Sequence, residues 1–364
     1  MEYVQEAIAT CHDFGGAAPS ADHSRVAVVV PMTAAEARTE TATAVLDTVA
    51  AHDPARIVVP VRADADAIGP IADWIGGFDA RTDCLWCSAP ALDDRLAAAG
   101  IDAPPGKGRD VWLGLGVAAA AADRVVVHDA DVASYSPATL DRLVFPLDRG
   151  ADFVKGYYAR VERDGLYGRL FRLFVRPVLD AIADRHDAPI VRYLRAFRYA
   201  LSGSIATTAA LARQLEPPPG WGLEIATLGT AFEHAGFEAT AQVDLGRHVH
   251  DHRPVAGDDG LEAMASEVWT ALVDVLATHG VGVDPGTLEA QYRAVADRTI
   301  DRYALDAHFN GLPIDPGDER RQVERYADAI ASVDRVRRLP AWDRTDLDPG
   351  TVRSVATRAL RTTR

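Results

Sequence analysis

The chain has little lysine and little cysteine, and it lacks any long apolar run. No segment approaches the roughly 18 consecutive apolar residues that a membrane-spanning helix needs. The longest apolar segments, residues 26–31 and 125–127, have the length of strands. The N-terminal segment MEYVQEAIATCHDF has neither the basic start nor the apolar core of a secretion signal. We therefore expect a cytoplasmic protein with no membrane span.

The three cysteines, Cys11, Cys84 and Cys87, do not complete a metal site by themselves. Cys84 and Cys87 have the spacing of a zinc-binding or redox-active pair. A structural zinc site needs four ligands, and the chain contains no second pair of cysteines. We interpret the three residues as reduced thiols.

Lysine is nearly absent, and acidic residues outnumber basic ones. The chain contains 53 Asp and Glu against 38 Lys and Arg, so the formal net charge is −15, and Lys107 and Lys155 are its only lysines. A GC-rich genome explains arginine in place of lysine, but it does not explain the acidic excess. The combination indicates a halophilic protein in a salt-rich cytoplasm, where surface carboxylates stay solvated and their repulsion is screened. The negative charge also argues against nucleic acids and anionic membranes as partners.

Apolar runs and helical spacings alternate along most of the chain. The 364 residues exceed what one compact core usually holds, and the composition is that of a globular protein. The alternation predicts an α/β fold with a Rossmann-like, mostly parallel sheet. The predicted strands are residues 25–31, 56–61, 83–86, 124–128, 152–159 and 239–245. The predicted helices are residues 34–51, 70–75, 106–122, 137–147, 167–184, 190–199 and 223–236, with a glycine-centred turn before a helix at 201–206 and a rigid loop at 217–222.

Three parts of the chain differ in pattern. Residues 1–24 form an irregular or short helical lead-in, residues 25–254 form the α/β domain, and residues 255–364 form a helical C-terminal subdomain. In this last part, helical spacing covers residues 261–278, 285–297, 322–338 and 350–360. We expect the subdomain to pack on the functional site or to mediate oligomerisation, and a homodimer is among the assemblies that this allows.

Asp129 and Asp131 follow a buried strand with one residue between them. Two carboxylates this close raise each other's pKa or need a counter-ion. A divalent cation bound to a diphosphate supplies that counter-ion, because hard cations prefer oxygen ligands. The sequence therefore predicts a metal site here, at the edge of the sheet where such folds bind ligands. A second D-x-D, at Asp64 and Asp66, is interpreted as a loop or helix cap.

Three histidines, His248, His250 and His252, lie within five residues after the last predicted strand. A neutral imidazole is a suitable third metal ligand. Spacing alone does not decide which of the three would bind.

The two lysines and one glutamate complete the set of candidates. Lys107 lies between two glycines at a helix start, where an ammonium group and free backbone N–H groups suit a phosphate, although the spacing is not that of a P-loop. Lys155 lies in a strand, where a charge needs a sheet edge or a partner. Glu224 lies near a helix N-terminus, where it either complements the helix dipole or orients an acceptor hydroxyl or stabilises a sugar cation.

The order of these motifs is specific: GKG, a strand followed by DAD, FVKGYY, PGWGLEI and HVHDHRP. It resembles the retaining GT-A glycosyltransferases typified by glucosyl-3-phosphoglycerate synthase and its mannosyl counterpart, from about residue 25 to 254. The resemblance implies a GT-A fold in which Asp129, Asp131 and His250 bind Mg²⁺ or Mn²⁺ against the diphosphate. It also implies that Lys107 contacts the nucleotide-sugar and that Glu224 lies near the sugar and the acceptor.

The resemblance extends to the substrate pockets, where the sequence departs from the family pattern. Pro31, Asp129 and Ala130 fall at nucleotide-sugar positions, but residues 31–36 and 61–66 differ from the family's P-A-L-N-E-E and D-S-x-S-T-D elements. Gly168 and Arg169 resemble the start of a G-R-V-T element that binds the acceptor phosphate. The threonine of that element falls at Phe171, and an acceptor-binding asparagine falls at His252. The donor base, UDP or GDP, and the acceptor, 3-phosphoglycerate or a related compound, therefore stay open.

The sequence predicts a metal-dependent retaining glycosyltransferase that moves a hexose from a nucleotide-sugar to a small acceptor. Glu224 and Lys107 are its predicted catalytic residues. One alternative is a sugar nucleotidyltransferase, which usually carries a loop rich in glycine and arginine after the first strand, unlike PMTAAEART here. The other is a non-catalytic relative that binds a nucleotide-sugar. The presence of four site residues argues against it: Asp129, Asp131, Glu224 and His250.

Overall fold

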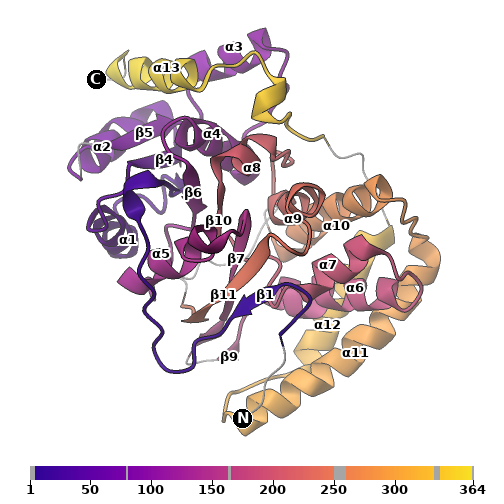
Figure 1. The fold of residues 1–364 in the computed structure, drawn as a ribbon. Coiled ribbons are helices and arrows are strands. Elements are labelled where there is room, and N and C mark those ends of the chain that lie inside the picture. Colours follow the sequence, from indigo (N-terminus) through magenta and orange to yellow (C-terminus); the bar gives the residue numbers. More distant parts are fainter. Residues whose placement is uncertain (1–4, 79–80, 163–164, 250–259, 332–336, 363–364) are drawn as a thin grey trace.

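A sheet of nine strands runs through the centre of the protein, with helices on both faces (Figure 1). The structure is a computed structural model that describes residues 5–78, 81–162, 165–249, 260–331 and 337–362. Across the sheet the order is β5 (Thr82–Trp86), β4 (Arg56–Arg62), β2 (Val26–Val29), β6 (Arg124–Val127), β10 (Ile205–Thr208), β7 (Phe153–Ala159), β11 (Thr240–Arg247) and β1 (Ala9–Cys11), and β3 (Met32–Thr33) continues the line of β2 beside β4.

The apolar runs of the sequence form the buried middle of this sheet. Every side chain of β2 is buried, as are the three valines of β6. Strands covered on both faces read as continuous apolar runs because neither face meets water. β10 is antiparallel to its neighbours β6 and β7, and the other pairings described in this sheet are parallel. The predicted α/β fold with a mostly parallel sheet is therefore confirmed.

Helices cover the two faces as in a doubly wound fold. On one side lie α1 (Glu40–Ala50), α2 (Ala65–Ile75) and α5 (Pro137–Val144); on the other lie α4 (Lys107–Ala119), α8 (Ala209–Gln214) and α9 (Leu223–His234) (Figure 1). α4 contacts β2, β4 and β6, whereas α5 contacts β6, β7 and β11. This arrangement leaves the carboxyl ends of the parallel strands at one edge of the sheet, where ligands bind in such folds.

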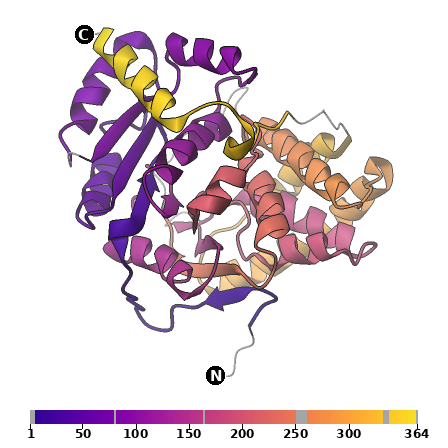
Figure 2. The same ribbon diagram turned by 45° about the horizontal axis from the view of Figure 1, so that its top comes forward.

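The C-terminal helices separate into two groups. α10 (Leu261–Thr278), α11 (Pro285–Phe309) and α12 (Pro316–Ala331) pack with one another and with a π-helical segment (Leu170–Val175), α6 (Arg176–Ala183) and α9. α13 (Pro349–Thr362) instead returns to the other end of the sheet, where it contacts β5, α4 and α3 (Pro90–Ala98) (Figure 2). The remaining elements are α7 (Pro189–Ala196), the small hairpin β8 (Val161–Glu162) and β9 (Gly165–Leu166), and short 3-10 turns. No described helix has the length and apolarity needed to cross a bilayer.

Two tryptophans hold the C-terminal segment against α4. The rings of Trp112 and Trp342 stack with centroids 4.5 Å apart, and the Trp342 indole N–H donates to the Trp112 carbonyl at 2.9 Å. The Trp112 indole N–H donates in turn to the Pro340 carbonyl at 2.9 Å. Gly116 makes room for this contact, since a Cβ there would lie 2.1 Å from the Trp342 ring.

The N-terminal lead-in contains a strand, which contradicts the irregular or helical prediction at that point. β1 pairs in parallel with β11, and the Gln242 amide donates to the Thr10 hydroxyl at 2.9 Å. A three-residue strand shows no usable periodicity, and its partner lies more than 200 residues away in the sequence. Local pattern therefore carried no signal for it.

The predicted turn and helix start at residues 201–206 are also partly wrong. Ile205 opens β10, a four-residue strand inserted between β6 and β7, and the helix that follows begins only at Ala209. Its sequence, IATT, is too short to show alternation.

Several helix limits differ from the prediction. Residues 34–38 form turns, and α1 begins after Thr39, whose hydroxyl accepts from the Ala42 N–H. α2 begins at Ala65 with Asp64 as its N-cap residue, which confirms the helix-cap interpretation of the second D-x-D. α3 was not predicted, and α11 extends to Phe309.

Candidate active site

Asp129 lies just beyond the carboxyl end of β6, at the centre of the sheet edge. Its carboxylate packs against the backbone of Gly203, which precedes β10, and a Cβ at position 203 would lie 2.3 Å from Asp129 Oδ2. The glycine therefore allows the loop to approach the carboxylate more closely than any other residue would. Ala130, the next residue, is buried.

Lys107 brings two predicted site residues together. Its Nζ lies 3.0 Å from Asp129 Oδ1 and 3.4 Å from Glu224 Oε1. Its ammonium also lies 5.5 Å from the centroid of the Trp221 ring. Burial opposes the charge of Lys107, but the carboxylates of Asp129 and Glu224 outweigh it and raise the pKa of Lys107 well above its usual range.

The two glycines beside Lys107 are explained by the loop at residues 217–222. A Cβ at Gly106 would lie 2.4 Å from the Pro219 carbonyl oxygen, and one at Gly108 would lie 1.9 Å from that of Pro218. The Arg109 N–H donates to the Pro219 carbonyl at 2.9 Å, which closes this contact. The loop continues directly into α9, whose first turn carries Glu224. The GKG and PGWGLE motifs thus form one packed unit.

Lys155 joins the same site from β7. The two lysines of the chain line one small pocket together with Asp129, Glu224, Ser202 and Gly203. Lys155 is 1% exposed, and its Nζ has no hydrogen-bond partner among the described residues. Burial lowers the pKa of Lys155 to about 8, an effect that Glu224 opposes and Lys107 reinforces. The sequence left this lysine undecided, and the signal that could have found it was its retention in a chain so poor in lysine.

The segment that carries the three histidines is tied to the DAD loop. The Ala133 N–H donates to the Val249 carbonyl at 2.9 Å, and the Val249 N–H donates to the Ser134 hydroxyl at 3.0 Å. His248 is buried and its ring stacks on Tyr158 with centroids 3.7 Å apart, which gives it a packing role. His250 and His252 lie outside the described residues, so their predicted roles stay predictions.

The predicted acceptor residues lie where the C-terminal helices meet the α/β domain. Arg169 pairs with Asp318 of α12 at 2.8 Å, and the buried Arg172 pairs with Glu319 at 2.6 Å. Arg169 directly precedes the π-helical segment Leu170–Val175, and Arg172 lies within it. A π-helical turn is a geometry frequent at functional sites. The prediction that the C-terminal part packs on the site is consistent with these contacts.

Arg160 is a further candidate that the sequence did not indicate. It lies just after β7, and a Cβ at Gly168 would lie 3.7 Å from its Cδ and 3.6 Å from the Tyr199 hydroxyl. Burial opposes the charge of Arg160, but the neighbouring Tyr199 and, more weakly, Asp131 raise its pKa. Its Nε is buried without a hydrogen-bond partner among the described residues. Arg160 thus connects the surroundings of Asp131 to those of Gly168.

The nucleotide end of the site is less complete. Pro31 is buried between β2 and β3. Glu36 does not face open space, because its carboxylate accepts hydrogen bonds from the N–H and the hydroxyl of Thr33 at 2.6 and 2.9 Å. The larger cavity of the described chain lies elsewhere, between α3 and α13, and its lining of Trp86, Pro90 and Val355 shares no residue with this site.

The sheet, the D-x-D position and the motif order can be compared with known proteins. Glucosyl-3-phosphoglycerate synthase of Methanococcoides burtonii is 34% identical over 269 residues, which cover 68% of this chain and 65% of that protein. The enzyme of the same name from Persephonella marina is 32% identical over 290 residues, covering 75% of this chain and 72% of that protein. No family profile matches the chain.

The chain belongs to the glucosyl-3-phosphoglycerate synthase family. Its fold is similar to that of the Mycobacterium tuberculosis synthase in complex with Mn²⁺, UDP and phosphoglyceric acid, with a TM-score of 0.56 and 25% identity over 76% of this chain and 88% of that one. The same enzyme with Mg²⁺ and UDP gives a TM-score of 0.56 at 26% identity. The predicted GT-A fold and the family resemblance are confirmed, and family membership argues against the nucleotidyltransferase alternative.

The match to the Methanococcoides burtonii synthase spans 65% of that protein, just under two thirds of its length. The oxygen ligands available at the site suit a hard divalent cation, because Asp129 and Asp131 offer carboxylates just beyond the end of β6. The chemistry of the residues therefore fits the Mn²⁺ or Mg²⁺ that the M. tuberculosis enzyme binds.

Proposed function

We propose that this protein transfers glucose from UDP-glucose to 3-phosphoglycerate or a closely related phosphorylated acid. The observation that carries the proposal is the junction of Asp129, Lys107 and Glu224 at the end of β6. It is supported by crystal structures of the M. tuberculosis relative, one of which contains Mn²⁺, UDP-glucose and phosphoglyceric acid.

On the donor side, positive charge surrounds the proposed diphosphate position. Asp129, Asp131 and the undescribed His250 would hold Mg²⁺ or Mn²⁺, which neutralises the leaving diphosphate when bound. Lys107 and Lys155 bring two further ammonium groups into the same pocket. Charge stabilisation of the leaving group is commonly the largest catalytic effect in such transfers. Pro31 and Ala130 would border the nucleotide-sugar.

On the sugar, the bond between the anomeric carbon and the diphosphate oxygen breaks, and a bond to the acceptor oxygen forms on the same face. The proton of the acceptor hydroxyl passes to the departing diphosphate oxygen, which balances the step. Glu224 is 7% exposed and is held by Lys107, so its carboxylate is positioned to orient that hydroxyl or to stabilise the developing sugar cation.

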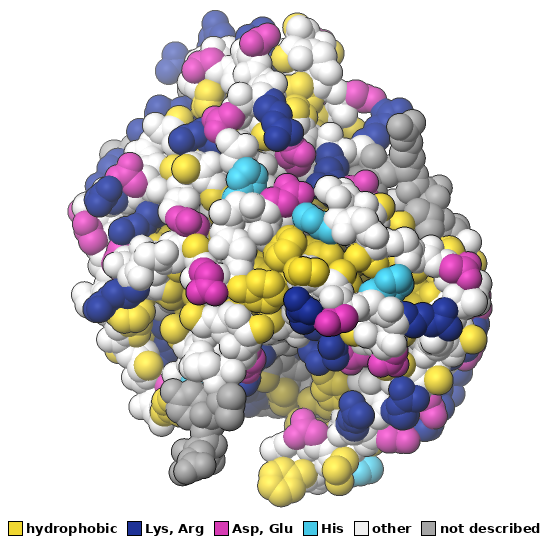
Figure 3. Space-filling view, turned by 45° about the vertical axis from the view of Figure 1, so that its right-hand side comes forward, with side chains coloured by type: hydrophobic (Ala, Val, Ile, Leu, Met, Phe, Trp, Pro, Cys, Tyr) yellow, Lys and Arg dark blue, Asp and Glu magenta, His cyan; other side chains and the backbone are white. Residues whose placement is uncertain are grey.

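On the acceptor side, we assign the phosphate to Gly168, Arg169 and Arg160, with His252 as the residue at the position of the family's asparagine. Arg169 already pairs with Asp318, whereas Arg160 presents a buried Nε without a partner among the described residues. A guanidinium binds phosphate well because its donors match the phosphate oxygens in geometry. The charges on the face shown in Figure 3 are interspersed, without a broad basic area, as suits a small-molecule partner better than a nucleic acid.

The test is a panel of donors and acceptors with the purified protein in molar KCl. UDP-glucose, GDP-glucose, GDP-mannose and ADP-glucose are each combined with 3-phosphoglycerate, 2-phosphoglycerate and glycerate, with Mg²⁺, Mn²⁺ or a chelator. We expect nucleoside diphosphate release with UDP-glucose and a phosphorylated acceptor, and none with the chelator.

The control pair uses two of the D-x-D motifs of the chain. Asp129→Ala should abolish turnover, whereas Asp346→Ala, at an exposed position before α13, should leave it unchanged. The proposal fails if no donor turns over, or if Asp129→Ala retains metal-dependent activity. Gel filtration of the same samples tests the predicted homodimer, and thermal stability that rises with KCl tests the salt-rich cytoplasm.

A further inference from the structure

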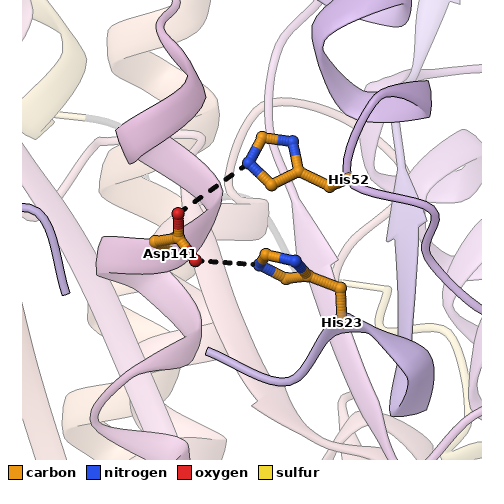
Figure 4. Close-up of side chains that lie close together, drawn as sticks. All are labelled: His23, His52 and Asp141. Carbon is orange, nitrogen blue, oxygen red and sulfur yellow. Dashed lines mark ion pairs between the residues drawn. The ribbon is translucent and has the colours of Figure 1, made fainter. Parts of the chain in front are cut away.

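A second group of possible metal ligands lies outside the pocket described above. His23 belongs to a 3-10 turn (His23–Arg25) before β2, His52 follows α1, and Asp141 lies in α5 (Figure 4). The ligand atoms of these three side chains all lie within 4.8 Å of one another. His23 Nε2 is 3.1 Å from Asp141 Oδ1, and His52 Nε2 is 3.9 Å from Asp141 Oδ2.

The ring of His52 is oriented as in many metal-binding histidines. Its Nδ1 lies 2.8 Å from the Thr48 carbonyl oxygen at the end of α1. A proton on Nδ1 satisfies that carbonyl and leaves a lone pair on Nε2, which points toward Asp141 (Figure 4). Nε2 also lies 2.9 Å from the Pro137 carbonyl oxygen. With the proton on Nδ1, Nε2 presents a lone pair to this oxygen, an unfavourable contact that a cation bound at Nε2 relieves.

His23 supplies the second nitrogen. Its Nε2 is buried and makes no hydrogen bond of normal geometry, although Asp141 Oδ1 is near. The two imidazole rings meet edge to face with centroids 4.7 Å apart.

Asp141 faces both imidazole rings from α5 (Figure 4). Its Oδ1 accepts a hydrogen bond from the Ala21 N–H at 3.2 Å, and its side chain is 23% exposed against 13% and 11% for His23 and His52. The three side chains are thus reachable from solvent but mostly sheltered.

We propose that His23, His52 and Asp141 bind one divalent transition-metal ion, of which Zn²⁺ is the reference. Two imidazoles and one carboxylate suit Zn²⁺, Co²⁺ or Ni²⁺ better than Mg²⁺ or Mn²⁺. Bonds of about 2.0–2.2 Å place zinc ligands roughly 3.3 Å apart, so small side-chain rotations close the site. The Pro137 carbonyl or a water molecule supplies the fourth ligand.

Such an ion joins three parts of the fold that are far apart in the sequence: the lead-in, the end of α1 and α5. None of the three residues lines the pocket of Asp129 and Lys107. Its effect is therefore on stability, because a ligand that binds only the folded chain stabilises it by mass action. It acts independently of the proposed glycosyl transfer.

The experiment uses the full chain with Asp129→Ala, so that the predicted catalytic metal site does not contribute. After chelator treatment the protein is titrated with Co²⁺, followed by visible absorption, and with Zn²⁺, followed by calorimetry and melting temperature. We expect one ion per chain, a visible band of four-coordinate Co²⁺, and a Tm that Zn²⁺ raises by several degrees. His52→Gln should remove all three responses, and the exposed His308→Gln should remove none.

Asp141→Asn is the second variant, since it preserves shape and should weaken binding at least tenfold. The proposal is overturned if His52→Gln binds Co²⁺ and Zn²⁺ as its parent does. It is also overturned if the parent binds neither Co²⁺ nor Zn²⁺.

Discussion

Gly203 and Asp129 are in contact so close that no side chain fits between them: a Cβ on Gly203 would lie 2.3 Å from Asp129 Oδ2. The glycine belongs to the loop that enters β10, and the aspartate lies just beyond the end of the neighbouring β6. Because these two strands are adjacent, the loop of one forms the wall behind the carboxylate of the other. The position of the predicted metal ligand therefore depends on a residue that has no functional group.

We expect Gly203→Ala to displace the Asp129 carboxylate and to lower activity by at least tenfold. The apparent affinity for Mn²⁺, measured from the metal dependence of turnover, should fall with it. Gly69→Ala is the control, because a Cβ at that helical position meets nothing within 4 Å. Equal activity in the two variants would contradict the contact.

We expect Lys155→Met to be more stable than the wild type but less active. The ammonium is buried without a hydrogen-bond partner among the described residues, and burial lowers its pKa to about 8, so the charge costs folding free energy. In the proposed function the same charge faces the donor diphosphate, and its loss should lower kcat by about tenfold or more. Thermal unfolding and turnover on the same sample provide the measurement. A variant that keeps full activity would show that Lys155 has no part in the transfer.

Arg160→Gln should raise the KM for a phosphorylated acceptor by roughly ten- to a hundredfold, the effect of losing one or two charge-assisted hydrogen bonds. The KM for UDP-glucose should change little. Arg192→Gln is the matched control, because Arg192 pairs with the exposed Asp187 at the surface. A change in the donor KM alone would place Arg160 on the other substrate.

We expect the stability of the wild-type protein to depend on pH through Asp110, and the variant Asp110→Asn to lack this dependence. Burial raises the pKa of Asp110 to about 6, although Arg62 at 3.3 Å and Arg109 lower it. The folded state then binds the proton more tightly than the unfolded state, so this stabilisation is present in acid and is lost as pH rises from about 4 to 6. The free energy of unfolding of Asp110→Asn minus that of the wild type should rise by about 1–2 kcal/mol from pH 4.5 to pH 7.5, as measured by urea unfolding. The same difference at both pH values would refute it.

Trp342→Ala should destabilise the protein by about 3–5 kcal/mol, since it leaves a cavity beside Trp112 and removes the hydrogen bond from the Trp342 indole to the Trp112 carbonyl. Trp74→Ala, which removes a half-buried ring that packs against Phe78, should cost less. Urea unfolding of both variants gives the comparison. An equal cost would contradict the greater contribution expected of the stacked Trp112–Trp342 pair.

The fold was predictable where burial leaves a continuous apolar run, as in β2 and β6, and where a cap marks a helix start. It was not predictable where a strand depends on a distant partner. β1 and β10 are three and four residues long, and each forms because neighbouring strands offer open hydrogen-bonding edges.

The residues of the candidate site were likewise predictable only in part. Asp129, Lys107 and Glu224 were predicted from short motifs, and the structure places the Lys107 ammonium 3.0 Å from the Asp129 carboxylate and 3.4 Å from that of Glu224. Gly203 and Arg160 were missed, since their relevance arises only from the insertion of β10 and from packing around Tyr199. No local pattern encodes either contact.

β1 also closes one edge of the central sheet. Removing residues 1–24 as a dispensable lead-in would leave the backbone N–H and carbonyl groups of β11 along that edge unpaired. Exposed strand edges are templates for pairing with other chains. A shortened version of this protein would therefore be expected to aggregate edge to edge, so the N-terminal residues need to be kept in any attempt to crystallise or engineer it.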